Sequence, residues 1–367
     1  VGDTTYLTGG EGFKRPSITR FSGPGGSQYQ EFDKVVLDAA LSFIQERGPR
    51  DDRRPFFLQV GFESPHYWFT CPPEDFDLYA GRVGASALPD GWSDCLHLHN
   101  RRIVANGGLE SIPEADVTRT RTAYYGLVTF TDRMVGQVVS AIEEQGLKNE
   151  TLILYLSDHG EMAGHHGLWW KHNFYDEASR VPLIVSWPGR FPRGCRVPDL
   201  VSLVDILPSL CDWTDAPRPP SLAGESLDGL VRSETASPDR AVFSELCGGY
   251  PGGKSVARMV RQGPWKYNYY HGQPAELFHL ENDPGELHDL ASDPAHKEVC
   301  DRLEMLTLED WDPEAVAAMW HEYREVSPYM RQWTEAVNPP DPDQWDGMKP
   351  PFPEEWRQNA LSAMRVP

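Results

Sequence analysis

The sequence predicts an α/β fold in which a central, mostly parallel sheet is flanked by helices and followed by a small antiparallel sheet. Three observations support this class. A segment with helical periodicity followed by a buried apolar strand occurs twice within residues 31–157. A third apolar strand follows soon afterwards. Beyond residue 235, short strand-like segments alternate with turn residues, which is typical of an antiparallel sheet.

The first helix is predicted over residues 31–46, EFDKVVLDAALSFIQE, because its apolar residues recur at roughly helical spacing. RPFFLQVGF, residues 54–62, follows as a short buried strand. A second helix is predicted over residues 121–146, where apolar residues recur at steps of three and four. The next strands, TLILYLS at 151–157 and VPLIVSWPG at 181–189, are continuously apolar, as strands covered on both faces should be.

The C-terminal part of the chain predicts a smaller unit. AVFSEL, ARMVRQGPWKYNYY and AELFHL read as its strands, and residues 297–308 as a closing helix. The final residues are rich in proline and should be extended and irregular. We therefore expect the remainder of an α/β domain over residues 1–235, an antiparallel sheet with a helix over 236–337, and a proline-rich tail over 338–367.

The composition disfavours two classes of partner. The 367 residues include 55 acidic and 34 basic side chains, which gives a formal net charge of −21. Such a surface repels nucleic acid and anionic lipid, and no apolar run approaches the roughly 18 residues of a membrane span. Neither nucleic acid nor a membrane is therefore an expected partner. Six widely spaced cysteines indicate no dense disulfide framework, and localisation stays open.

Polar residues follow two of the predicted strands at the point where each strand ends. Ser-Pro-His occupies residues 64–66, and Asp158 and His159 follow the strand at 151–157. Because ligands of such sheets bind beyond the carboxyl ends of the strands, these two clusters can share one crevice. Asp158 and His159 suit a divalent metal, although a helix-capping aspartate and a packed histidine are the plainer alternative. Lys171 adds a cation or is merely solvated.

Several longer stretches together indicate a family. SDHGEMAGHHGLWWKHNFYDEASRVPLIVSWPG resembles the second signature region of the sulfatases, the sulfuric ester hydrolases of the alkaline phosphatase superfamily. PFFLQVGFESPHYWFTCPPEDF resembles the family's strand that ends in Pro-His. LVSLVDILPSLCDWTDAPRPPSLAGESL and ELFHLENDPGELHDLASDP resemble its later segments. The resemblance covers most of residues 31–308 in the family's order and implies a sulfatase-like fold.

The resemblance implies roles for four residues. Asp158 and His159 would bind the metal, for which Ca²⁺ is expected. Since the family more commonly has asparagine where His159 stands, Mn²⁺ and Zn²⁺ stay open. Lys171 would contact the sulfate and its bridging oxygen, and His66 would lie beside the leaving group. A cation and a proton donor at that oxygen stabilise the charge that develops in the transition state.

Four further residues are candidates for contact with substrate, on weaker grounds. His165, His166 and His172 lie in the loop that carries Lys171, and the first two could also touch the metal. The alternative is that the loop is simply bounded by glycines and the histidines are structural. Trp68 follows Ser-Pro-His-Tyr and could form an aromatic wall, although packing is the commoner role of such a residue.

The nucleophile is the main departure from the family. Sulfatases convert the cysteine or serine of Cys/Ser-x-Pro-x-Arg to formylglycine, and none of the six cysteines begins this motif. The family's first strand, with its paired metal-binding aspartates, is also missing. We therefore expect that an N-terminal segment outside this sequence supplies formylglycine, that the gene continues upstream, and that the chain alone has no turnover.

Two alternatives to a sulfate ester hydrolase remain open. One is a phosphonate monoester or phosphodiester hydrolase of the same superfamily, and the other is a non-catalytic anion-binding relative. For a sulfatase, the expected substrate is a small ester with an aryl, sugar or choline-type group. Residues 81–120 are a candidate lid. The tail is a candidate for contacts within a homo-oligomer, because such polar, proline-rich segments often wrap a neighbouring subunit.

Overall fold

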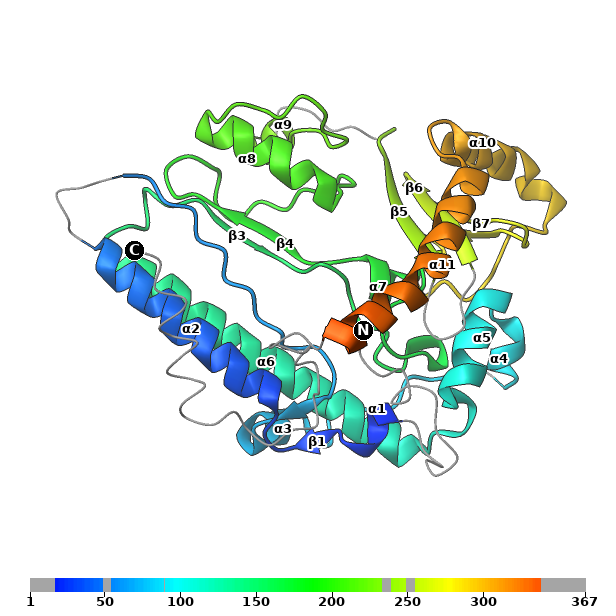
Figure 1. Ribbon diagram of the computed structural model, residues 1–367, viewed down its shortest axis with the longest axis horizontal. Helices are drawn as coiled ribbons and strands as arrows, with labels where there is room; N and C mark the ends of the chain where they lie inside the picture. The colour runs from blue at the N-terminus through cyan, green and yellow to red at the C-terminus, as the bar shows by residue number, and fades with distance from the viewer. Residues whose placement is uncertain (1–16, 49–53, 89, 233–238, 249–254, 338–367) are drawn as a thin grey trace.

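The computed structural model describes residues 17–48, 54–88, 90–232, 239–248 and 255–337. Two long helices, α2 (Gln28–Arg47) and α6 (Glu114–Glu144), lie side by side (Figure 1). Their facing apolar stripes pack into shared clusters that include Leu37 and Leu127, and Ile44 and Ile142. The two helices predicted from apolar spacing are therefore confirmed, and both extend beyond the predicted starts.

The central strands β3 (Ile153–Leu156) and β4 (Leu183–Ser186) confirm two predicted strands. They pair antiparallel, with Leu156 opposite Leu183, whereas the sequence suggested neighbouring parallel strands. The reason is the connection between them, which holds only short helical turns, while parallel neighbours need a crossover that is usually a full helix. The overall class, mixed helix and sheet with a small antiparallel sheet near the C-terminus, is confirmed.

The predicted buried strand at residues 54–62 was wrong. The segment is extended and runs between the helix pair and the central strands (Figure 1), but it is hydrogen-bonded into no ladder among the described residues. Its burial alternates: Leu58 packs on the cluster that contains Ile44 and Ile142, whereas Phe57 is 79% exposed. The segment has the shape of a strand without a hydrogen-bonded neighbour.

The C-terminal sheet agrees with the sequence. It comprises β5 (Ala241–Gly248), β6 (Ser255–Gln262), β7 (Trp265–Tyr270) and β8 (Glu276–His279), all antiparallel to their neighbours. Helix α10 (Lys297–Leu308) packs Leu303 onto this sheet, as predicted. Helix α11 (Pro313–Val337) was not predicted. The tail at 338–367 lies outside the described residues.

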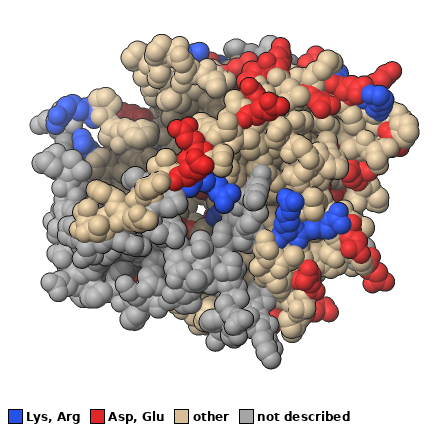
Figure 2. Space-filling model, turned by 45° about the vertical axis from the view of Figure 1, so that its right-hand side comes forward, with Lys and Arg blue, Asp and Glu red and all other residues tan. Residues whose placement is uncertain are grey.

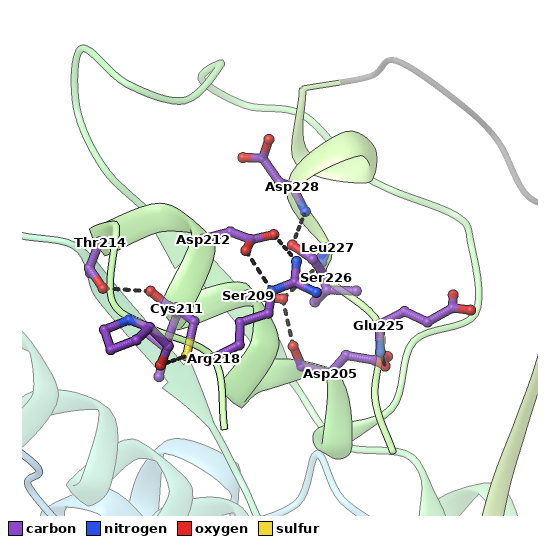
Figure 3. A network of polar contacts seen from close by, with 12 residues as sticks. Asp205, Ser209, Cys211, Asp212, Thr214, Arg218, Glu225, Ser226, Leu227 and Asp228 are labelled. Atoms are coloured by element: carbon purple, nitrogen blue, oxygen red, sulfur yellow. Dashed lines mark hydrogen bonds and ion pairs between the residues drawn. The ribbon is translucent and has the colours of Figure 1, made fainter. Parts of the chain in front are cut away.

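A lobe formed by η4 (Leu203–Asp205), α8 (Ile206–Thr214) and α9 (Asp228–Val231) covers one face of the central strands. Its polar core is Asp205, which is 1% exposed and accepts hydrogen bonds from the backbone N–H groups of Ser202 and Glu225. Figure 3 shows Asp205 below Ser209, whose hydroxyl donates to the Asp205 carbonyl and accepts from Leu227 N–H. Asp205 thus joins a helix start to a distant loop.

The candidate lid at 81–120 is largely helical, with α4 (Trp92–Cys95), α5 (Leu98–Gly107) and η2 (Leu109–Ser111). The remaining elements are short; they are α1 (Ser17–Arg20), β1 (Gly23–Pro24), β2 (Thr70–Cys71), α3 (Pro73–Tyr79), η3 (His165–Gly167), α7 (Asp176–Ser179) and η5 (Pro294–His296). None of the described helices combines the length and apolarity that crossing a membrane requires. Acidic side chains are scattered over much of the described surface drawn in Figure 2.

Candidate active site

The loop that carries His66 is fixed by a buried carboxylate of α2. Asp33 is fully buried, and its two oxygens accept hydrogen bonds from the backbone N–H groups of Glu63 (2.7 Å) and Ser64 (3.0 Å). The ring of Tyr29, one helical turn earlier, meets the His66 ring edge to face at 5.7 Å. Helix α2 therefore sets where the end of the extended segment, and with it His66, lies.

His66 and Lys171 form the centre of the site. Lys171 Nζ donates to His66 Nε2 at 3.2 Å, although 105 positions separate the two residues in the chain. His66 Nδ1 donates to the carbonyl of Tyr67 at 2.8 Å, so the neutral ring carries its proton on Nδ1 and accepts at Nε2. Burial, reinforced by the Lys171 ammonium, lowers the pKa of His66 to about 4. The ring is therefore neutral near pH 7, and the mobile proton of the pair resides on Lys171.

Lys171 lies among acidic groups. Burial lowers its pKa, and the carboxylates of Glu161, Asp158 and Glu63 oppose that shift. The same Lys171 charge opposes the rise that burial causes in the pKa of Glu63. Glu63 was not predicted from the sequence. It directly precedes Ser-Pro-His, so its position at a strand end is the signal that could have identified it.

The loop after β3 is held by its first residues. Ser157 Oγ donates to the carbonyl of His159 at 2.9 Å, and Gly160 N–H donates to the carbonyl of Ala178 at 2.8 Å. A Cβ on Gly160 would lie 2.0 Å from the carbonyl oxygen of Glu177, so only glycine fits this approach. The close contact brings the two ends of the loop together and leaves Asp158 and His159 at its mouth.

Asp158 and His159 have the geometry of a ligand pair. His159 Nδ1 donates to the carbonyl of Gly160 at 2.8 Å, which leaves the lone pair on Nε2. That nitrogen lies 3.5 Å from Asp158 Oδ2, a separation that two ligands of one ion can have. The pair fits part of a divalent metal site. Among the residues that the structure describes, no group of three or more histidine, cysteine or acidic side chains could complete one.

The other predicted contacts lie at several places around the loop. His165 Nδ1 lies 3.4 Å from Glu177 Oε1, and the ring of His166 stacks on Tyr175 at 3.8 Å. Neither contact involves Lys171 or His66, and a role in substrate binding stays a prediction for both histidines. His172 follows Lys171 directly, and burial together with the Lys171 charge lowers its pKa to about 4.

Trp68 lies in an aromatic group beside His66. Its ring meets Phe21 at 5.2 Å and Tyr67 at 5.8 Å, both edge to face. Tyr67 itself stacks on His66 at 4.2 Å, and Lys171 Nζ lies 5.8 Å from the centre of the Tyr67 ring. Tyr67, which the sequence did not single out as a site residue, therefore touches the central pair more closely than Trp68 does. Its position next to His66 in the sequence is the only signal for it.

One Ser-x-Pro-x-Arg match does occur in the chain, at Ser186–Arg190, and sequence reasoning missed it. Ser186 ends β4 and pairs with Ile153, the first residue of β3, whereas Asp158 follows the last residue of β3. Strands rise by about 3.3 Å per residue, so Ser186 and the candidate site lie at opposite ends of the ribbon. The match is therefore part of a strand end and no nucleophile for this site.

Family models match two overlapping parts of the chain. The model described as "Sulfatase" matches residues 3–216, and the model described as "N-sulphoglucosamine sulphohydrolase, C-terminal" matches residues 164–311. Choline-sulfatase of Rhizobium meliloti is 32% identical over 321 residues, which is 80% of this chain and 58% of that protein. Arylsulfatase K of Rattus norvegicus is 33% identical, over 79% of this chain and 54% of that protein. The chain thus spans little more than half the length of these relatives.

Solved structures agree on the fold. A sulfatase structure from Bacteroides thetaiotaomicron has a TM-score of 0.59 at 25% identity and covers 76% of this chain and 62% of that one. The phosphonate monoester hydrolase of Agrobacterium radiobacter has a TM-score of 0.66 at 24% identity, over 86% of this chain and 66% of that one, which supports the fold alone. Since the sulfatase model spans more than half of its residues, the chain belongs to the sulfatase family.

Proposed function

We propose that this protein hydrolyses sulfate esters, with Lys171 and His66 at the oxygen of the leaving group. The observation that supports the proposal most strongly is the 3.2 Å contact between Lys171 Nζ and His66 Nε2. The loop after the extended segment 54–62 and the loop after β3 bring a neutral imidazole and a cation together next to Asp158 and His159. That combination suits a substrate that carries negative charge and develops more of it on a leaving oxygen.

The protonation states of the pair assign different tasks to the two residues. Cleavage of the bond between sulfur and the bridging oxygen leaves negative charge on that oxygen, and the Lys171 ammonium can donate a proton or a hydrogen bond to it. His66 is neutral and accepts from Lys171 at Nε2, while the carbonyl of Tyr67 fixes its ring. His66 thus directs the ammonium towards the leaving group, and the pair together stabilises the transition state more than the ground state.

Asp158 and His159 would hold a divalent ion, for which Ca²⁺ is the expected species, with Mn²⁺ and Zn²⁺ as alternatives. When bound, the ion would supply positive charge that stabilises the sulfate group and an activated oxygen nucleophile. The two donors fit part of such a site, because Asp158 Oδ2 and His159 Nε2 lie 3.5 Å apart.

The nucleophile of the reaction is proposed to be a formylglycine on a segment other than the 367 residues. Neither a cysteine motif nor the strand-end match at Ser186 supplies it at this site. One feature of the fold supports the proposal: Tyr155 and Ile184, which are paired across β3 and β4, are 36% and 59% exposed on the face opposite the α8 lobe. A segment that packs on this apolar face would bring a nucleophile to the same strand ends.

The proposed substrate is a small sulfate ester with an aryl, sugar or choline-type group. Relatives named choline-sulfatase and arylsulfatase support this class. The aromatic rings of Tyr29, Tyr67 and Trp68 beside His66 suit a flat or cationic group, because aromatic faces attract both. A phosphonate monoester or a phosphodiester is the alternative that an assay must compare.

The test is turnover of sulfate monoesters, phosphonate monoesters and phosphodiesters by the protein expressed from its complete reading frame. Sulfate esters should react fastest, and Lys171→Ala and His66→Ala should each lower kcat on an ester with a poor leaving group by on the order of 10²-fold. Preference for a phosphonate ester would move the protein to the alternative class. Near-wild-type rates for both variants would contradict the assignment of the pair. The isolated 367-residue chain should show no turnover.

A further inference from the structure

The backbone on both sides of Lys171 adopts an unfavourable conformation. Trp170 has φ +68° and His172 has φ +55°, so both neighbours of the lysine lie in the left-handed region that favours glycine. A bulky residue persists there only where the surrounding structure holds it, and such residues cluster at functional sites. Contacts from the surrounding structure must therefore hold the backbone of residues 170–172 in place.

Two side chains, Glu161 and His99, bond the backbone before and after Lys171. Glu161 Oε1 accepts a hydrogen bond from the backbone N–H of Trp170 at 2.7 Å and a second from Ala163 N–H at 3.0 Å. His99 Nε2 donates to the carbonyl of His172 at 2.6 Å. Asn173 Nδ2 adds a bond to the carbonyl of Lys171 itself at 3.1 Å. The N–H of Trp170 and the carbonyls of Lys171 and His172 are therefore each bonded to a side chain. The carbonyl of Trp170 accepts from the backbone N–H of Met162 at 2.9 Å.

His99 connects the lysine loop to the C-terminal sheet. The residue lies near the start of α5 and is 1% exposed, and its Nδ1 lies 2.9 Å from the hydroxyl of Ser255 at the start of β6. Because the carbonyl of His172 can only accept, Nε2 carries a proton, and in the neutral ring the Ser255 hydroxyl donates to Nδ1. The ring thus has a defined tautomer, which a residue that merely filled space would not need.

We propose that His99 and Glu161 are positioning residues for Lys171, which hold the strained backbone on either side of it so that its ammonium meets His66 and the leaving group. The proposal rests on the proposed function of Lys171 and adds two residues to it. Neither residue is proposed to touch the reacting atoms. Each acts through one hydrogen bond to the backbone next to the lysine.

The proposal predicts a dependence on the leaving group. A misplaced Lys171 costs most when the leaving oxygen needs a proton, and displacement of a catalytic group by about 1 Å can lower a rate by 10²-fold. His99→Met removes the donor at similar volume and should lower kcat/KM on poor leaving groups by about 10- to 100-fold. On an activated ester such as 4-nitrophenyl sulfate, the loss should stay below about threefold, since little protonation is needed.

Conservative variants separate positioning from general loosening. His99→Gln keeps an N–H donor and should stay within about threefold of wild type on all esters. Glu161→Gln keeps the acceptor but removes a negative charge near Lys171, so it should lose less activity on poor leaving groups than Glu161→Met, which should behave like His99→Met. His97→Gln is the matched control, because His97 contacts Pro274 and Tyr270 and accepts the backbone N–H of His99 at Nδ1 (3.1 Å), a bond that the glutamine oxygen can replace, and does not bond to residues 170–172. It should leave the dependence on leaving group unchanged.

A double-mutant cycle completes the experiment. If His99 acts through Lys171, His99→Met should cost less than about threefold once Lys171→Ala is present. Equal losses on all esters, or losses that multiply in the Lys171→Ala background, would overturn the proposal and leave the function of Lys171 intact. A Lys171→Ala variant without any dependence on leaving group would instead overturn the proposed function, and the positioning roles with it. Should His99→Met fail to fold, the two Glu161 variants decide by the same criteria.

Discussion

At the scale of single residues, we expect His159 to determine which ion the proposed ligand pair favours. Calcium prefers oxygen ligands, whereas zinc and manganese accept imidazole. His159→Asn replaces the ring nitrogen near Asp158 Oδ2 with an amide, and we expect it to strengthen Ca²⁺ binding relative to Zn²⁺ by at least about tenfold. Titration calorimetry of the protein from its complete reading frame measures both affinities. Asp158→Ala is the control and should weaken both ions, and an unchanged ratio in His159→Asn would exclude His159 as a ligand.

The position after apolar segments predicted that Ser-Pro-His at 64–66 and the pair Asp158 and His159 share one crevice, and the resemblance to the sulfatases implied that Lys171 and His66 lie at the same leaving oxygen. The sequence could not predict where His165 and His166 point. Ala163 and His166 both have positive φ, and such turns redirect every later side chain of a loop without a periodic signal. The stacking of His166 on Tyr175 depends on these turns, so the sequence alone could not predict it.

At the scale of elements, the α8 lobe depends on Asp205. Removing this buried carboxylate leaves Arg240, whose Nη2 lies 2.7 Å from Oδ2, and two backbone N–H groups without their acceptor. Asp205→Ala should therefore lower the free energy of unfolding by about 3–5 kcal/mol in urea denaturation. Asp212→Ala is the matched control, because it breaks an ion pair with Arg218 at the exposed surface of the same lobe (Figure 3) and should leave the midpoint unchanged. Equal effects of the two variants would contradict the role of Asp205.

The contact of α5 with the C-terminal sheet should weaken in acid. His97 stacks on Tyr270 at 3.8 Å and donates to the carbonyl of Pro274 at 2.9 Å, and burial lowers its pKa to about 4. Because the ordinary histidine pKa is about 6.5, the unfolded chain binds more protons between these values, and stability falls as the pH falls through that window. From pH 7 to pH 5, His97 should account for a loss of about 1–2 kcal/mol.

His97→Gln keeps a donor for Pro274 but cannot be protonated, so its denaturation midpoint should change less between pH 7 and pH 5 than that of the wild type. Urea titrations at several pH values check this. His288→Gln, at a side chain that is 78% exposed, is the control and should retain the wild-type pH dependence. A variant at His97 with the full pH dependence would show that other groups cause it.

Helices whose apolar residues recur with a strong period could be predicted from the sequence. The hydrogen-bonded pairing of strands could not. The apolar residues of α2 and α6 recur at helical spacing, so they indicate helices whatever surface these helices pack against. The continuous apolar character of β3 and β4 indicates burial but carries no information on direction, and their antiparallel pairing follows from the loop between them. Residues 54–62 have the composition of a strand, yet a strand needs a hydrogen-bonded neighbour, which no local pattern specifies.

At the scale of the whole molecule, the net charge and the exposed apolar face of β3 and β4 have opposite effects on association with other molecules. A net charge of −21 favours dispersion in solution, whereas an exposed apolar face favours association. Phe57, Tyr155 and Ile184 are all large, apolar and exposed, and the last two are paired residues of the central strands. The sequence predicted these strands to be covered on both faces, whereas among the described residues the α8 lobe packs on one face and leaves Tyr155 and Ile184 exposed on the other.

Ile184→Ser tests whether a further segment covers this face. In the 367-residue chain the variant should lower binding of a hydrophobic dye, because Ile184 is 59% exposed there. In the protein expressed from its complete reading frame, burial of Ile184 under the proposed segment would make the same change lower the free energy of unfolding by about 2–4 kcal/mol. Met305→Ser on α10, at a side chain that is 69% exposed, is the matched control. It should change the free energy of unfolding by no more than about 0.5 kcal/mol, both in the 367-residue chain and in the protein from the complete reading frame. Equal stability of Ile184→Ser and wild type in the complete protein would show that the face stays open, and the formylglycine would then have to reach the strand ends from another side.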